Sequence, residues 1–176
     1  SKSLANPNRS DADRERDGRD KPQDVLELAG FKKGMVIADI FGGGGYYSEI
    51  LSRVVGPKGR VLLLNNAPYD NYVKKEIGPR LADKRLPNVE YRVVPNDNLG
   101  LAENSLDGAL IVMSYHDLFY ADAENGWPAI DSSQFMGQIV SGLKPGGRLL
   151  IVDHSAKAGA ASSDTKALHR IEEQYA

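Results

Sequence analysis

The sequence predicts an α/β protein built on a three-layer, doubly wound and mostly parallel sheet. Segments of strand type alternate with segments of helical type along most of the chain, as in folds with helices on both faces of one sheet. The strand segments are nearly continuous apolar runs, which is typical of strands buried on both faces. A run of four glycines follows the first of these strands directly. The length of 176 residues favours a single domain.

The first twenty residues differ from the rest because they are polar and dense in charge. We expect a loose N-terminal arm over residues 1–20, with a short helix from Asp11 to Asp17. The arm is interpreted either as a solvated tail or as a flap over a cofactor pocket. The domain itself is expected to span residues 21–176.

The domain is predicted to open with a short helix. Asp20 is a candidate cap for its start, Pro22 suits its first turn and Gly30 suits its end. Further helices are predicted over Tyr46–Val55, Pro68–Lys84 with an interruption at Gly78–Pro79, Asp131–Leu143, and from within residues 161–176.

Five apolar runs are predicted strands: Met35–Ile40, Arg60–Asn65, Asn88–Val94, Ser105–Ser114 and Arg148–Asp153. In a parallel doubly wound sheet, ligands bind beyond the carboxyl ends of the strands. The residues that directly follow each strand are therefore the candidate site.

The glycine run Gly42–Gly45 lies between the first strand and a helix. Glycine permits positive φ and lets a ligand touch the main chain, and the helix start offers free N–H groups to that ligand. A tight turn needed only for packing is the alternative. The dinucleotide pattern G-x-G-x-x-G would need a glycine where Ser48 stands, and a phosphate loop would need a lysine after the glycines.

The arrangement of Asp39, Gly43, Gly45 and Tyr46 resembles motif I of the class I S-adenosylmethionine-dependent methyltransferases. The stretches "PNDNLGLAENSLDGALIVMS" and "LKPGGRLLIVD" resemble later motifs of that superfamily, in the same order. The resemblance covers approximately residues 20–155. A bacterial subgroup of predicted methyltransferases without an assigned substrate is the most similar, through "GGGYY", "YHDL", "DH" and "LHRI".

The resemblance implies a Rossmann-like methyltransferase fold with S-adenosyl-L-methionine as cofactor and S-adenosyl-L-homocysteine as product. The full sheet of that fold has seven strands, so the C-terminal strands are expected to be missing, and a second copy of the chain could cover the open edge as a homodimer. The residues expected to bind the cofactor lie after the first four strands: Asp39, Gly42, Gly43, Gly44, Gly45, Tyr46, Asn65, Asn66, Asp97, Asn98 and Ser114.

Within that set, the resemblance implies that Asp39 orients the methionine amino group and that Asp97 meets the adenine amino group. Two positions depart from the superfamily pattern. Phe41 stands at the usual first glycine, and Asn65 stands where an acid usually binds both ribose hydroxyls. Because charge-assisted hydrogen bonds are about twice as strong as neutral ones, we expect weaker cofactor binding or a different register.

His116 and Asp117 are the candidate catalytic residues, because they follow the fourth strand on the acceptor side of this fold. A histidine beside a carboxylate can remove a proton from a hydroxyl or amine. A purely structural His116 is the alternative. No metal is expected, since the spacing carries no ligand signature; a cluster of His116 and His154 with a neighbouring aspartate is the alternative. Trp127 is interpreted as a substrate wall or as loop packing.

Composition limits the partners. A net charge of −2 with scattered basic residues disfavours nucleic acid as a partner. No apolar run approaches the roughly 20 residues that span a bilayer. The absence of cysteine excludes disulfides and thiolate sites. A small-molecule substrate is expected. The cytoplasm, where S-adenosylmethionine is made, is the expected location; export is the alternative if a leader preceded Ser1.

These observations predict a methyltransferase that moves a methyl group to an oxygen or nitrogen nucleophile by in-line displacement. Two alternatives stay open. One is a catalytically inactive binding or scaffold protein with the same fold, and the other is a nucleotide-dependent oxidoreductase.

Overall fold

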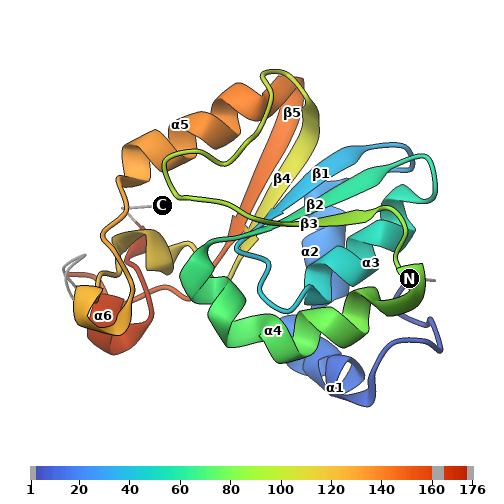
Figure 1. Cartoon of the computed structure of the whole chain (residues 1–176), viewed down its shortest axis with the longest axis horizontal. Helices are drawn as coiled ribbons and strands as arrows, with labels where there is room; N and C mark the ends of the chain where they lie inside the picture. Colours follow the sequence, from blue (N-terminus) through green and yellow to red (C-terminus); the bar gives the residue numbers. More distant parts are fainter. Residues whose placement is uncertain (1–2, 160–164, 174–176) are drawn as a thin grey trace.

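The computed structural model describes residues 3–159 and 165–173. Five strands form one sheet in the order β3-β2-β1-β4-β5 (Figure 1). All four strand pairs are parallel, which confirms the predicted sheet. The strands are β1 (Val36–Ile40), β2 (Arg60–Asn65), β3 (Val89–Val93), β4 (Leu106–Val112) and β5 (Leu143–Val152).

The α-helices are α1 (Asp11–Asp20), α2 (Pro22–Ala29), α3 (Tyr46–Val55), α4 (Ala67–Leu81), α5 (Ser132–Gly142) and α6 (Thr165–Leu168). Short 3-10 turns are η1 (Ala82–Lys84), η2 (His116–Phe119) and η3 (Ala123–Asn125). None of the helices within the described residues has the length and apolar character needed to cross a membrane.

Successive residues of each strand point to opposite faces, so the apolar runs feed two separate cores. On one face, Ile37 and Val61 pack with α2 and α3. On the other face, Ile40 and Leu62 pack with Phe135 of α5. Helix α5 therefore lies across the sheet from α2 and α3 (Figure 1). The strand order reverses between β1 and β4, which places the site at their carboxyl ends.

The N-terminal segment is not the loose arm that its composition predicts. Helix α1 runs three residues further than expected, to Asp20. Arg80 of α4 pairs with Asp13 of α1 at 2.7 Å and with Glu49 of α3 at 2.6 Å. Arg9 adds a pair with Asp17 at 2.6 Å. The charges that predict a solvated tail instead bind α1 to the domain.

Two expected helix boundaries are wrong. Asp20 ends α1 and does not cap α2; Lys21, with a φ of 43°, separates the two helices. Helix α4 continues through Pro79 without the predicted interruption. Pro79 lies two residues before the helix end, and the ion pairs of Arg80 hold this last turn in place.

Strand β5 begins at Leu143, five residues earlier than expected, because the predicted turn "KPGG" is an irregularity within the strand. The register against β4 shifts between the pairs Leu106–Leu143 and Gly108–Arg148. The C-terminal helix expected within residues 161–176 is present as α6 only, and residues 160–164 and 174–176 lie outside the described part. An isolated bridge between Ser155 and Ile171 returns the chain to the strand ends.

Candidate active site

The glycine loop connects β1 to α3 in a conformation that side chains disfavour. Gly43 and Gly45 have φ values of 56° and 81°. Phe41, at the position of the usual first glycine, also has a positive φ of 51°, so the backbone keeps a left-handed conformation there despite the side chain. A Cβ atom on Gly42 would lie 2.5 Å from the Asp39 carboxylate and from Leu63. The loop therefore packs against its own strand at Gly42.

Asn65 at the end of β2 holds this loop. The Gly43 N–H donates to Asn65 Oδ1 at 3.1 Å, and Asn65 Nδ2 donates to the Gly43 carbonyl at 3.0 Å. Asn66 caps α4 by accepting a hydrogen bond from the Tyr69 N–H at 3.0 Å. Both amide side chains are thus engaged within the protein, and their contacts with the cofactor stay a prediction.

Asp39 is buried at the end of β1. Ser48 of α3 donates a hydrogen bond to its carboxylate at 2.6 Å. Burial raises the pKa of Asp39 to about 6, and the hydrogen bond from Ser48 opposes that rise. Ser48 stands where a dinucleotide-binding fingerprint has its third glycine. The residue that breaks that fingerprint therefore forms a hydrogen bond with Asp39, the predicted partner of the cofactor's ammonium group.

A cavity of about 150 Å³ opens beside the loop. Its lining consists of Arg16, Asp39, Phe41, Gly42, Gly43, Gly44, Tyr46, Tyr47, Tyr69, Val112, Met113 and Ser114. The structure thus brings Asp39, most of the glycine run, Tyr46 and Ser114 to one cavity, and their contacts with a cofactor stay a prediction. Asp97 and Asn98 are exposed in the turn after β3 and are not among the described residues that line this cavity.

Arg16 was missed by sequence reasoning. It reaches the cavity from α1, where its guanidinium lies 4.2 Å above the Tyr46 ring. Tyr46 is itself fixed to α1 by a hydrogen bond to Asp17 at 2.6 Å. Nε of Arg16 pairs with Asp20 of the same helix. The cavity therefore presents a carboxylate and the remaining N–H groups of a guanidinium, which would suit the ammonium and carboxylate of the methionine end of S-adenosylmethionine. Only the interpretation of the arm as a flap pointed toward this contact.

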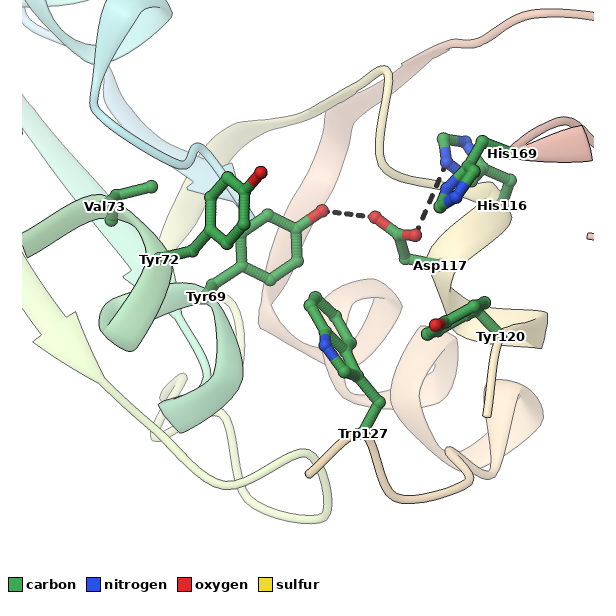
Figure 2. Close-up of a pocket in the computed structure, with 8 residues that line it drawn as sticks. All are labelled: Tyr69, Tyr72, Val73, His116, Asp117, Tyr120, Trp127 and His169. Carbon is green, nitrogen blue, oxygen red and sulfur yellow. Dashed lines mark hydrogen bonds and ion pairs between the residues drawn. The ribbon is translucent and has the colours of Figure 1, made fainter. Parts of the chain in front are cut away.

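A second cavity of about 310 Å³ adjoins the first, because Tyr69 lines both. Its walls are Tyr69, Tyr72, Val73, His116, Asp117, Tyr120, Trp127 and His169 (Figure 2). Tyr69 and Tyr120 each contact the Trp127 ring edge-on, at centroid distances of 5.4 and 5.6 Å. Trp127 is thus a cavity wall as well as a packing residue.

The two candidate catalytic residues lie together in this second cavity. His116 Nδ1 is 2.9 Å from Asp153 Oδ2, and His116 Nε2 is 3.4 Å from Asp117 Oδ1. Burial lowers the pKa of His116, but the hydrogen bond with Asp153 and the charges of Asp117 and Asp153 outweigh burial and raise it. Burial raises the pKa of Asp117, whose other oxygen accepts a hydrogen bond from the Tyr69 hydroxyl.

The histidine that lies near His116 is not the one in the alternative metal cluster of the sequence analysis, which is His154. His154 is exposed and is not part of the group. His169 takes that place, with its ring centroid 5.8 Å from that of His116. The bridge from Ser155 to Ile171 brings His169 to the cavity; the sequence signal for it was only the segment "LHRI".

Cofactor binding is expected to weaken at low pH. The raised pKa of Asp39 means that its protonated form is favoured in the folded protein below pH 6, and a protonated carboxyl cannot pair with the ammonium. The polar groups around the Asp39 carboxylate are Ser48, Arg16 and Tyr47. Titration calorimetry with S-adenosylhomocysteine should show about tenfold weaker binding at pH 5 than at pH 7.5. Asp39→Asn should bind weakly at both pH values; a wild-type affinity that does not change with pH would contradict the pairing.

Comparison with known proteins agrees with this geometry. No protein-family model matches the chain. The chain is 33% identical over 132 residues to a ubiquinone/menaquinone biosynthesis C-methyltransferase UbiE of Pseudomonas putida strain F1, covering 74% of this chain and 46% of the relative. A protein of the same name from Pseudomonas fluorescens is 30% identical over 140 residues, covering 79% and 49%. The chain thus spans about half the length of the curated relatives it matches.

A solved structure shares the fold. It is an S-adenosylmethionine-dependent methyltransferase from Aquifex aeolicus, with a TM-score of 0.68 and 22% identity, covering 99% of this chain and 80% of that chain. The parallel sheet agrees with this neighbour's fold class. The chain therefore has the Rossmann-like methyltransferase fold, and its sequence is similar to those of the UbiE C-methyltransferases.

Proposed function

We propose that this protein transfers a methyl group from S-adenosylmethionine to an oxygen or nitrogen nucleophile of a small, flat molecule. One observation carries the proposal: two cavities meet at Tyr69. One presents the charges that suit an amino-acid end group, and the other is an aromatic chamber with a buried histidine and carboxylate. A donor and an acceptor bound in adjoining cavities can react by in-line displacement.

The donor cavity has the parts to hold the cofactor. Among the residues that line this cavity, Asp39 would pair with the ammonium and Arg16 with the carboxylate, and the glycine run would let the main chain approach the cofactor. When bound, the cofactor supplies an electrophilic methyl group on a sulfonium. Its adenosine part is expected to follow the carboxyl ends of β2 and β3, where Asn66, Asp97 and Asn98 are the predicted partners.

The acceptor cavity favours activation by proton removal. Asp153 contacts the Nδ1 side of His116, and Nε2 lies 3.4 Å from Asp117 Oδ1 at the cavity wall. In the neutral tautomer with its proton on Nδ1, Nε2 would accept a proton from the nucleophile. The walls from Tyr69, Tyr120 and Trp127 suit a planar ring. Removing the proton of a ring hydroxyl makes both the oxygen and the adjacent ring carbon nucleophilic. Carbon methylation is the second candidate, because the sequence relatives are named C-methyltransferases.

The test measures methyl transfer from labelled cofactor to a panel of phenols, aromatic amines and hydroxyquinones. We expect product that carries one added methyl group, and His116→Ala should lower kcat by about 10²- to 10⁴-fold. Titration with S-adenosylhomocysteine should give the wild-type affinity in this variant, since His116 does not line the donor cavity. His154→Ala, at an exposed position, is the matched control and should keep full activity.

The outcomes separate the remaining alternatives. Unchanged kcat in His116→Ala would remove the general-base role. Cofactor binding without any product across the panel would favour the inactive binding protein. Binding of a nicotinamide dinucleotide in place of S-adenosylhomocysteine would favour the oxidoreductase, although Ser48 and its bond to Asp39 count against that reading.

A further inference from the structure

We propose that His116, Asp117 and His169 bind a divalent transition-metal ion in the acceptor cavity. One ligand atom from each of the three residues lies within 4.8 Å of the others. Bonds of about 2.0–2.1 Å to one tetrahedral ion place ligand atoms about 3.3 Å apart, so small side-chain rotations complete the site. Two imidazoles and one carboxylate suit zinc or iron and leave coordination positions open.

The side chains around the cluster orient two of the ligands. Asp153 accepts the backbone N–H of His116 at 2.9 Å and also contacts Nδ1 of its ring at 2.9 Å. A carboxylate on the remote ring nitrogen is the usual support of a metal-binding histidine, and it directs Nε2 at the cluster. The Tyr69 hydroxyl donates to Asp117 Oδ2 and leaves Oδ1 facing His116 (Figure 2).

The third ligand is held in an unusual backbone conformation. His169 has a φ of 47°, a left-handed value that costs energy in a residue other than glycine. Its N–H donates to the Thr165 carbonyl at 2.8 Å, and its ring stacks on Tyr120 at a centroid distance of 5.8 Å. The His169 ring lies perpendicular to that of His116, and both rings are on the same side of the cavity (Figure 2). Because His169 is exposed, an ion can reach the cluster from solvent.

The surrounding charge also favours a cation. Asp117 and Asp153 both lie next to His116. Among the described residues that line this cavity, none is a lysine or an arginine. Two carboxylates without a competing cation on the cavity wall attract a divalent ion.

A bound ion would change how the acceptor is activated. The Nε2 lone pair of His116 cannot bind the ion and accept a proton at once. An acceptor hydroxyl at an open coordination position would instead have its pKa lowered by the ion. This consequence rests on the proposed methyl transfer, whereas metal binding itself does not.

The experiment titrates tag-free protein, without cofactor or acceptor, with cobalt(II) as a spectroscopic probe and then with zinc(II) as competitor. We expect one visible ligand-field band that saturates at one ion per chain and is displaced by zinc. His169→Ala should weaken binding at least about tenfold, and Asp153→Asn should weaken it by about 10- to 100-fold through the misplaced His116 ring. His154→Ala removes an exposed histidine outside the cluster and should bind as the wild type does.

Other results would overturn the site. The site is overturned if a large excess of metal produces no visible band and no heat of zinc binding. It is also overturned if His154→Ala and His169→Ala lose the same amount of metal affinity. Circular dichroism of each variant controls for folding, and His169 is at the surface, so its replacement leaves a folded protein to test. The metal titration contains no cofactor, so absence of metal binding does not contradict the methyl-transfer proposal. Absence of cofactor binding likewise does not contradict the metal site.

Discussion

Replacing Arg80 with alanine is expected to lower the free energy of unfolding by about 3–5 kcal/mol, because it leaves the buried Asp13 carboxylate without its ion-pair partner. The Arg80 side chain is 11% exposed, and those of Asp13 and Glu49 are 9% and 0% exposed. Arg85 also pairs with Glu49, so Asp13 loses the most. Urea unfolding followed by circular dichroism measures the change.

The same substitution should loosen the donor cavity. Arg80 Nε donates to the Gly44 carbonyl at 2.5 Å, so it connects the glycine loop to α1, which carries Arg16. Affinity for S-adenosylhomocysteine should therefore fall together with stability. Arg14→Ala is the matched control, since Arg14 forms an exposed pair with Asp11 worth less than about 1 kcal/mol. Equal stability of the two variants would show that the buried network does not hold α1.

Gly42→Ala should reduce cofactor affinity by about tenfold to a hundredfold. The added Cβ would lie 2.5 Å from both Asp39 and Leu63, a distance that real Cβ contacts do not have. Leu63 is fully buried in β2, so Asp39 must move. A charge-assisted hydrogen bond is worth roughly 1.5–3 kcal/mol, which corresponds to that loss of affinity.

The control for this variant is Gly78→Ala. Gly78 lies within α4, and nothing lies within 4 Å of a Cβ added there. That change should leave affinity intact and stabilise the helix by about 0.5–1 kcal/mol. Titration calorimetry on both variants, with thermal unfolding to verify folding, makes the comparison. Wild-type affinity in a folded Gly42→Ala protein would mean that Asp39 does not contact the cofactor.

Local patterns predicted the elements whose causes are local. The helix predicted from Asp131 begins there, where Asp131 caps α5 by accepting from the Gln134 N–H at 2.9 Å, and Gly30 ends α2 as predicted. The apolar runs located the five described strands, although β5 begins five residues earlier than predicted, because burial on both faces gives the same apolar pattern whatever packs against the strands. The sequence predicts a short helix within a loose arm but not the packing of α1 against the domain, because Arg80, the partner of Asp13, lies 67 residues away.

The candidate site also has some features that the sequence predicts and others that only the tertiary structure shows. The sequence by itself determined the glycine turn, the position of Asp39 at a strand end, and His116 with Asp117 after β4, because parallel strands bring their carboxyl ends to one edge. Only the tertiary structure decided that Arg16 enters the donor cavity and that His169 joins His116. Those contacts join segments whose spacing along the chain carries no periodic signal, and they exist only once α1 and the segment after β5 pack against the sheet.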